Sequence, residues 1–230
     1  GRRSSTWSFP RSARPVPAAA ASVPPRRGRV NLARQRQLLK PTEFRAAYDR
    51  GAIPLRIQHS ATLNGIEWTV DPAQADLKFL LPLLVDGLKE KVDPYRFLAV
   101  MGSLELVEAS SPAALTECLA VLIVPLKSAL NTRDTEIIAL TCKFLQKLLT
   151  THQALGKYLV PYYRQLLPVL NIFRFANRNT GDKIEYGQRL ATNTGDLIEQ
   201  TLQLLEVTGG KDAFVNIKYL VPTYESYLQR

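Results

Sequence analysis

The chain has 230 residues, of which 46% are hydrophobic, with a mean hydropathy of −0.10 and a net charge of +10. This length holds one substantial domain or two small ones, and the longest apolar run, Leu119 to Leu126, is too short for a membrane span of about 20 residues. The N-terminus lacks the apolar stretch of a signal peptide, and prolines interrupt it where a transit peptide would be amphipathic.

The charge is concentrated at the N-terminus. Residues 1–42 carry ten cations and no acidic residue, whereas 20 basic and 20 acidic residues cancel from Glu43 onward. An asymmetry of this kind indicates an acidic partner. Nucleic acid, anionic lipid and the acidic surface of tubulin all qualify at this point.

Residues 1–42 also contain six prolines. This segment buries too little apolar surface to offset its ordering entropy, so we predict a basic Pro/Arg-rich arm that is disordered alone. Two aromatic residues near its start are either anchors for partner pockets or incidental exposed residues. The candidate residues of the arm for binding an acidic partner, microtubules among them, are Arg2, Arg3, Trp7, Phe9, Arg11, Arg14, Arg26, Arg27, Arg29, Arg34, Arg36 and Lys40.

A short β-hairpin is predicted near residues 55–70. Two alternating runs flank Asn64-Gly65: Leu55, Ile57 and His59, then Ile66, Trp68 and Val70. Asn-Gly suits a two-residue type I′ turn, because both central residues need positive φ. An isolated two-stranded hairpin is only marginally stable, so we expect it to pack against helices or a partner.

From Pro72 to the end, the apolar period is helical. Asp93-Pro94 and Ser111-Pro112 each predict an N-cap followed by proline at the first helical position. The clearest helix is predicted over 133–150. Its apolar stripe comprises Ile137, Ile138, Thr141, Phe144, Leu145, Leu148 and Leu149, and the side chains predicted to face away are Lys143, Gln146 and Lys147.

Another helix is predicted from about Gly195 to Val207, with Gly209-Gly210 ending it. Its predicted buried residues are Leu197, Ile198, Leu202 and Leu205.

The helical segments share a repeated feature, a proline at a regular spacing. Pro82, Pro125 and Pro168 each lie inside an apolar helical stretch, 43 residues apart. Armadillo and HEAT repeats have periods of about 40–47 residues, although the fourth expected position, near Lys211, has no match. We predict an all-α, armadillo/HEAT-like helical repeat solenoid over residues 43–230, following the arm over 1–42.

The sequence offers little for catalysis. His59 and His152 lack an evident acid or nucleophile partner and are read as structural, and phosphate-binding loops and nucleophile elbows are absent. Thr180-Gly181-Asp182 and Thr194-Gly195-Asp196 are read as a turn and a helix start. The chain is therefore predicted to be no enzyme, with no catalytic, cofactor-binding or metal-binding residues and no small-molecule substrate.

Two cysteines, Cys118 and Cys142, lie in apolar helical patterns without metal-ligand spacing. They are predicted to be buried thiols in a reducing compartment.

The last third of the chain is rich in tyrosine, which is favoured at interfaces. Packing between helices is an equal alternative for each one, and base stacking is disfavoured because no cationic excess accompanies the rings. The candidate protein-interface residues are Tyr162, Tyr163, Arg164, Tyr219, Tyr224 and Tyr227.

Five strings carry a family resemblance: LVPYYRQLLPVLNIF (159–173), NIKYLVPTYESYL (216–228), TEFRAAYDRG (42–51), DGL (86–88) and GDLI (195–198). They resemble the parkin co-regulated gene protein family, over about residues 42–230. The resemblance implies a helical armadillo/HEAT-like fold with no activity or cofactor. It also implies residence in the axoneme of cilia and flagella, at the inner junction where the B-tubule of a doublet microtubule closes onto the A-tubule.

The partners implied by the resemblance are α/β-tubulin, a small β-sandwich axonemal inner junction protein, other doublet-microtubule inner proteins and, in sperm, a small meiosis-expressed protein. No membrane partner is expected. Two alternatives remain open. One is a nucleic-acid-binding adaptor, which rests on the arm alone, and the other is a helical scaffold for cytoplasmic transport or signalling.

Overall fold

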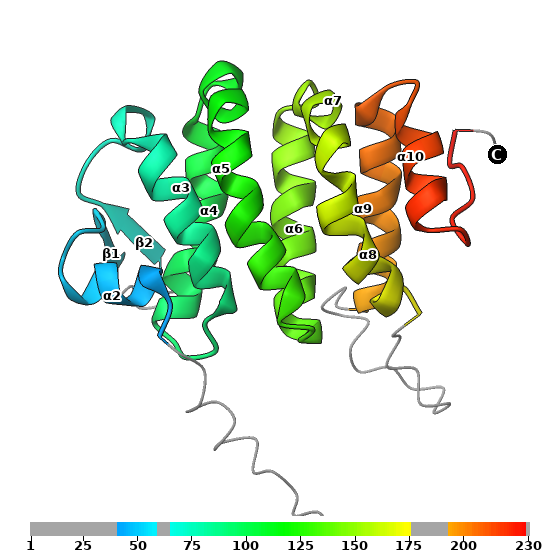
Figure 1. Cartoon of the computed structure of the whole chain (residues 1–230). Helices are drawn as coiled ribbons and strands as arrows, with labels where there is room; N and C mark the ends of the chain where they lie inside the picture. The colour runs from blue at the N-terminus through cyan, green and yellow to red at the C-terminus, as the bar shows by residue number, and fades with distance from the viewer. Residues whose placement is uncertain (1–40, 59–64, 176–192, 229–230) are drawn as a thin grey trace, which may run out of the picture. The chain divides into compact units, whose positions relative to one another are not determined.

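The structure is a computed structural model that describes residues 41–58, 65–175 and 193–228 (Figure 1). This part of the chain is mostly helical, with a small two-stranded antiparallel sheet, so the all-α prediction with a short hairpin is confirmed. The predictions for the arm residues up to Lys40, for His59, for Asn64 and for Thr180-Gly181-Asp182 lie outside the described residues.

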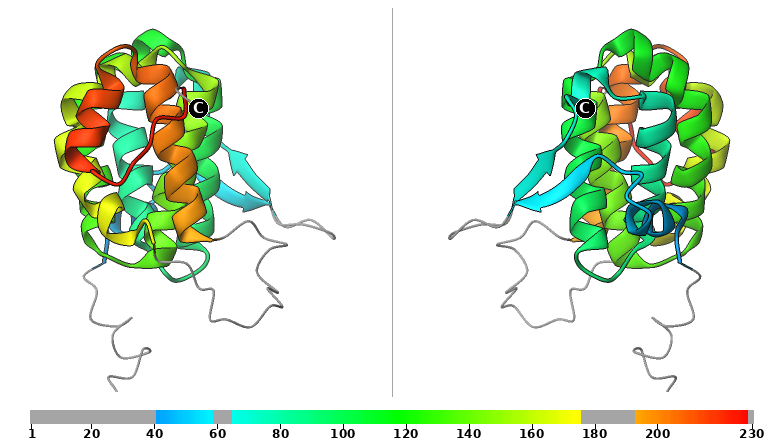
Figure 2. Two further views of the ribbon diagram at one scale, coloured as in Figure 1. Left: turned by 90° about the vertical axis from the view of Figure 1, so that its right-hand side faces the viewer. Right: turned by 90° about the vertical axis from the view of Figure 1, so that its left-hand side faces the viewer.

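The longer helices stand side by side in two rows that follow chain order (Figures 1 and 2). The first row contains α3 (Leu77–Asp86), α5 (Pro112–Asn131), α8 (Tyr163–Phe173) and α10 (Ala213–Leu220). The second row contains α4 (Tyr95–Ala109), α6 (Thr135–Thr151) and α9 (Thr194–Gly209). Helices pack against neighbours within a row and across the rows, and the main apolar core connects them.

Short elements complete the unit. Helix α2 (Glu43–Asp49) precedes the sheet, and α7 (Leu155–Leu159) leads through a 3-10 turn (Val160–Tyr162) into α8. Two further 3-10 turns, Pro72–Gln74 and Gly87–Lys89, flank α3.

The three evenly spaced prolines occupy corresponding places. Pro82, Pro125 and Pro168 lie inside α3, α5 and α8, which are successive helices of the first row. Their placement inside helices is confirmed. The pairing of successive helices across two rows is compatible with a repeat array, and the solenoid stays a prediction.

The strongest helix prediction is confirmed. Every residue of the expected apolar stripe of α6 is buried, because residues three and four apart share one helix face. Lys143 is exposed, as expected. The prediction for Gln146 is wrong: its Nε2 donates to the Leu197 carbonyl at 3.0 Å and to the Thr201 hydroxyl at 3.1 Å. Helix α9 covers this side of α6, which the periodicity of α6 alone does not indicate.

Of the two predicted helix starts, the one at Ser111-Pro112 is confirmed and the one at Asp93-Pro94 is wrong. Ser111 caps α5 and accepts a hydrogen bond from the Ala114 amide at 3.3 Å, with proline at the first helical position. The Asp93-Pro94 prediction is wrong, because Pro94 is itself the N-cap of α4. The Asp93 carboxylate lies 3.3 Å from Arg96 Nη2 in an ion pair instead of capping the helix.

The second predicted helix of the C-terminal part is present as α9, and its four expected apolar residues are buried. It ends at Gly209, two residues beyond the predicted Val207, and Gly210 follows at φ +83°, a conformation that L side chains rarely adopt. Gly209 still belongs to the helix. A Cβ there would lie 2.6 Å from Ala213 Cβ and 2.7 Å from Tyr163 Oη.

The hairpin has a different turn from the predicted one. Strands β1 (Leu55–Gln58) and β2 (Gly65–Trp68) pair antiparallel with Gln58 opposite Gly65. Gly65 is therefore a strand residue, and residues 59–64 connect the strands, so the two-residue Asn64-Gly65 turn is wrong. Contacts outside the hairpin favour this register: Leu55 is buried, and Trp68 Nε1 donates to Glu105 Oε2 of α4 at 2.9 Å.

Helix α5 is the one helix in the described part of the chain that is long and apolar enough to cross a membrane, by length and composition only. Half of its apolar window is buried inside the protein. It packs against α3, α6 and α8, which is how the core helix of a helical stack behaves.

Candidate interaction surfaces

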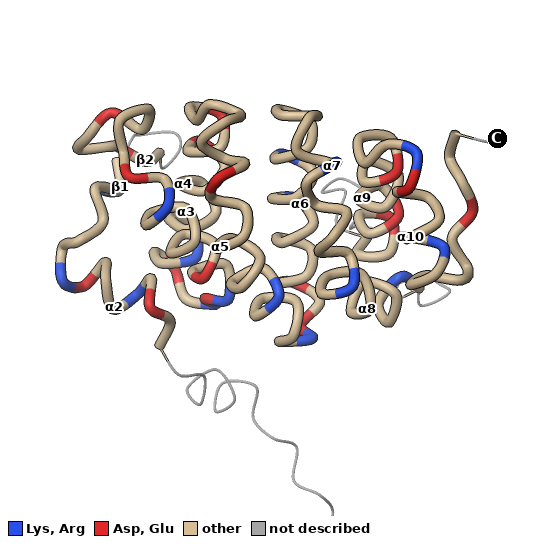
Figure 3. Tube along the Cα trace, turned by 45° about the horizontal axis from the view of Figure 1, so that its top comes forward, with Lys and Arg blue, Asp and Glu red and all other residues tan. Residues whose placement is uncertain are grey.

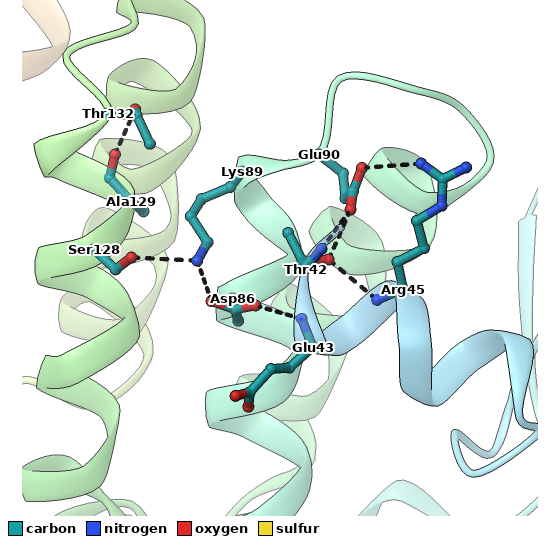
Figure 4. Close-up of polar contacts among 9 residues, drawn as sticks. All are labelled: Thr42, Glu43, Arg45, Asp86, Lys89, Glu90, Ser128, Ala129 and Thr132. Carbon is teal, nitrogen blue, oxygen red and sulfur yellow. Dashed lines mark hydrogen bonds and ion pairs between the residues drawn. The ribbon is translucent and has the colours of Figure 1, made fainter. Parts of the chain in front are cut away.

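We call Thr42 and Glu43, where residues 1–41 join the helical unit, the N-terminal root. A buried carboxylate holds it in place (Figure 4). Glu90 follows the 3-10 turn after α3 and is only 7% exposed. Its Oε1 accepts hydrogen bonds from Thr42 Oγ1 at 2.7 Å and from the Thr42 amide at 3.3 Å. Arg45 Nη1 lies 3.9 Å from the other carboxylate oxygen. Thr42, assigned to the arm from sequence, is thus fixed to the helical unit.

The same threonine starts helix α2. Thr42 Oγ1 accepts from the Arg45 amide at 3.1 Å, as an N-cap does. The next amide, of Glu43, donates to Asp86 Oδ2 at 3.1 Å. Asp86 pairs with Lys89, whose Nζ reaches Ser128 Oγ of α5 at 3.2 Å. The point where residues 1–41 join the helical unit is therefore tied to three further elements (Figure 4).

Aromatic contacts hold α2 from the other side. The Arg45 guanidinium carbon lies 4.4 Å from the centre of the Tyr95 ring, a cation–π distance. Tyr95 Oη donates to Asp49 Oδ1 at 2.8 Å, and this hydrogen bond raises the pKa of the Tyr95 hydroxyl. Phe44 is fully buried beneath. Helix α2 is short, and these contacts, more than its length, fix its position.

The C-terminal end is held by a second buried carboxylate. Glu206 of α9 is 2% exposed. It accepts hydrogen bonds from Tyr224 Oη at 2.7 Å, from the Tyr227 amide at 2.8 Å and from Ser226 Oγ. Burial by itself raises the pKa of the Glu206 carboxyl, but the hydrogen bonds outweigh burial and the pKa lies below its usual value. We call residues 221–228, which follow α10, the C-terminal strap.

An arginine adds a second tie to the strap. Arg174, just after α8, pairs with Glu199 of α9 through Nε at 2.8 Å and Nη2 at 2.7 Å. Its Nη1 donates to Thr223 Oγ1 at 2.8 Å, and its guanidinium lies 5.5 Å from the Tyr224 ring centre. The strap is thereby bound to both α8 and α9.

The structure divides the predicted tyrosine surface into an inner and an outer set. Tyr163 and Tyr224 are 1% and 0% exposed. Tyr163 Oη donates to the Leu205 carbonyl at 2.9 Å, and burial raises the pKa values of both hydroxyls. These two rings belong to the core. The stripe that Tyr163 forms with Leu166, Leu167 and Leu170 in the sequence is the signal that marks it as a core residue.

Two residues of the outer set, Arg164 and Tyr219, line a surface hollow. Tyr219 and Tyr227 are 77% and 53% exposed, Arg164 is exposed and Tyr162 is half-buried. A hollow of about 300 Å³ opens between the start of α8 and α10. We call it the α8–α10 hollow; its lining is Val160, Pro161, Tyr163, Arg164, Asn216, Tyr219 and Leu220.

The groups that could support chemistry are dispersed. In residues 41–58, 65–175 and 193–228, no three His, Cys, Asp or Glu side chains gather as a metal site would require. His152 Nε2 lies 3.1 Å from the Val107 carbonyl oxygen. Cys118 and Cys142 are buried free thiols, as predicted, and burial raises the pKa of Cys118 to about 11 and that of Cys142 to about 12.

Comparison with known proteins matches this unit from end to end. A family model described as Parkin co-regulated protein matches residues 42–226, from the N-cap of α2 into the strap. The Parkin coregulated gene protein homolog of Mus musculus is 47% identical over 189 residues, which cover 82% of this chain and 78% of that protein. Neither name is that of an enzyme class. The chain therefore belongs to the Parkin co-regulated protein family.

Proposed function

We propose that this protein is a non-enzymatic structural component of the doublet microtubules of cilia and flagella. Its place would be the inner junction, where it links the B-tubule to the A-tubule and binds α/β-tubulin and neighbouring junction proteins. The observation that carries the proposal is the family match, which spans the helical unit from Thr42 to Ser226. The resemblance of the sequence strings to the same family supplies the axonemal location.

The helical unit fits the role of a spacer. Charges of both signs are interspersed along it (Figure 3), and the sequence from Glu43 onward is neutral overall. Its successive pairs α3/α4, α5/α6 and α8/α9 would be repeats of an armadillo/HEAT-like array, in which each unit buries its apolar face against its neighbours. Such an array presents different faces to different partners. One face would meet B-tubule tubulin, and others would meet the small β-sandwich junction protein and other inner proteins.

The arm would supply the second attachment. All of the net charge of +10 lies in residues 1–42, and arginine pairs bidentately with the carboxylates of an acidic surface such as that of tubulin. Thr42 joins this arm to the helical unit and is fixed to Glu90 by two hydrogen bonds. A firmly held root would transmit the arm's binding to the unit.

Microtubule co-sedimentation tests the proposal. The full chain should pellet with microtubules, and its binding should weaken as salt is added, because exposed charges are screened over about 8–10 Å at physiological ionic strength. Deletion of residues 1–40 should reduce pelleting markedly, since it removes all ten cations of the arm. Unchanged pelleting of the deletion variant would contradict the role of the arm.

Localisation tests the axonemal role separately. A tagged full-length chain should label axonemes along their length, and density matching the two rows of helices should lie at the inner junction of a doublet reconstruction. If the tagged chain is absent from axonemes and the purified chain prefers DNA or RNA to microtubules in a competition gel shift, the nucleic-acid adaptor is the correct function.

A further inference from the structure

We propose that the α8–α10 hollow is a docking site for an acidic linear segment of a partner protein. The segment would place a carboxylate against Arg164 and insert a neighbouring apolar side chain beside Tyr219. This site is separate from the arm and its proposed contact with the microtubule, and it lies entirely on the helical unit.

The lining has the composition of a binding pocket. Val160, Pro161 and Leu220 contribute apolar groups to the lining, and Tyr219, which also lines the hollow, is 77% exposed. Tyrosine and arginine are the residues most often found at energetic hot spots of protein interfaces, next to apolar pockets. Tyr219 makes no hydrogen bond or ring contact within the described residues, so its ring is available to a partner.

The charge around the hollow selects an acidic partner. The segment from α7 through α8 (residues 155–173) contains Lys157 and Arg164 and no acidic residue, and α10 contains Lys218 and no acidic residue. Figure 3 shows blue but no red along α8. Lys218 donates to the Tyr224 carbonyl, and Arg174, just after α8, pairs with Glu199.

Arg164 differs from these cations. It is exposed, lines the hollow, and has no ion pair or hydrogen bond within the part of the chain that the structure describes. Lys157 on α7 is likewise exposed and unpaired there. The acidic residues that flank α10 in the sequence, Asp212 and Glu225, lie before and after the helix and not in the lining.

The same observations exclude the chain's own arm as the occupant. Residues 1–42 carry cations and no acidic residue, so they would bring like charge toward Arg164. A nucleic acid fits less well than an acidic peptide, because a phosphate backbone requires several cations along its path. The lining of the hollow contains one cation among apolar and amide groups.

The test uses the full-length protein and a labelled 12-residue peptide in which Glu alternates with Leu and Phe, at about 0.15 M salt to screen long-range attraction. The peptide also carries a photoreactive phenylalanine analogue, so that its position can be mapped. Crosslinks are expected in the 3-10 turn Val160–Tyr162, in α8 and in α10. A matching peptide with Gln in place of Glu should bind at least tenfold more weakly.

Charge-matched variants separate the hollow from the basic arm. Arg164→Glu and Lys143→Glu change the net charge equally, and both residues are exposed and unpaired in the described structure. Arg164→Glu and Tyr219→Ala should each weaken peptide binding by about tenfold or more, whereas Lys143→Glu, on α6, should leave it within twofold. Circular dichroism melting checks that each variant folds.

Three outcomes would overturn the proposal. Crosslinks confined to residues 1–42 would assign the binding to the arm. Equal losses in Arg164→Glu and Lys143→Glu would show attraction by net charge alone. Competition by a single-stranded oligonucleotide of equal charge, as effective as the peptide itself, would show phosphate recognition at the hollow.

Discussion

The two ends of the helical unit are each fastened by a buried glutamate, but the donors differ. Glu90 holds Thr42 at the N-terminal root and has a cation, Arg45, 3.9 Å away. Glu206 holds the C-terminal strap through Tyr224, Ser226 and the Tyr227 amide, and within the described residues no Lys or Arg pairs with it. Glu90 fixes the beginning of the short helix α2, whereas Glu206 binds several residues of the irregular C-terminal strap.

This difference has an energetic consequence. The Glu206 carboxylate is balanced by hydrogen bonds from neutral donors, so its contribution depends on all three being made together. The strap also includes the fully buried Tyr224 and Val221, so releasing it exposes core surface. The N-terminal root buries less: Thr42 is a cap residue, and Phe44 is the large core side chain of α2. We therefore expect the C-terminal fastening to matter more for global stability and the N-terminal one more for local order.

Glu206→Ala should produce the largest effect. It leaves the Tyr224 and Ser226 hydroxyls without an acceptor in the core, and we expect a loss of about 3–4 kcal/mol in the free energy of unfolding. Denaturant unfolding monitored by circular dichroism measures it. Glu136→Ala, which removes an exposed glutamate from the first turn of α6, serves as the control and should change stability by less than about 0.5 kcal/mol. A Glu206→Ala variant as stable as this control would show that the strap adds nothing to the core.

Glu90→Ala should be less damaging. It removes two hydrogen bonds from Thr42 and the nearby partner of Arg45, so we expect a loss of about 2 kcal/mol. Hydrogen exchange should show the loss as faster exchange of amides in α2, with α9 little changed. Thr42→Ala, which removes the N-cap side chain, should reproduce the pattern at about 1 kcal/mol. Faster exchange spread equally over all helices would contradict the local character of this fastening.

Acid should weaken the C-terminal fastening. The pKa of Glu206 is lower in the folded protein than its usual value of 4.5. The native state therefore binds fewer protons than the unfolded state in this range, so the carboxylate's stabilisation is present above the unfolded pKa and is lost as pH falls through the folded pKa. The stability difference between wild type and Glu206→Gln should be largest near neutral pH and should shrink below about pH 4. A difference that is constant from neutral to acid pH would rule out this linkage.

Both fastenings could not be predicted from the sequence because their partners are far apart along the chain. Thr42 and Glu90 are separated by 48 residues, and Tyr224 and Glu206 by 18. Neither pair shares a helix turn or a strand pairing that a local pattern would reveal. The Ser111 cap and the stripe of α6 were predicted correctly because capping and periodicity depend on residues a few positions apart. Gln146 was misassigned because its partners lie on α9, more than 50 residues away in the sequence, where the pattern of α6 gives no information.

The burial of the tyrosines could be predicted in part. Tyr162 and Tyr163 are adjacent, and composition alone treats them alike, whereas the helical stripe of α8 separates the buried ring from the half-buried one. The hairpin shows the limit of local rules. Asn64-Gly65 suits a tight turn, yet the strand register follows the burial of Leu55 and the hydrogen bond of Trp68 to α4.

Tyr163→Phe should produce the smallest effect and sharpens the comparison at the C-terminal end. Tyr163 Oη donates to the carbonyl of Leu205, the residue directly before Glu206. Phenylalanine keeps the buried ring and removes only this hydrogen bond, so we expect a loss of about 1 kcal/mol. For a unit of this size, that loss lowers Tm by about 2–4 °C, which differential scanning calorimetry resolves.

Tyr219→Phe is the matched control, because it removes a hydroxyl from a ring that is 77% exposed. Its Tm should stay within about 2 °C of wild type, since surface substitutions rarely exceed about 0.5 kcal/mol. The double variant Tyr163→Phe/Glu206→Gln then tests whether the two bonds at this end act together. If the hydroxyl of Tyr163 positions the turn of α9 that carries Glu206, the combined loss will differ from the sum of the single losses by more than about 0.5 kcal/mol. Strict additivity would show that Glu206 holds the strap independently of Tyr163.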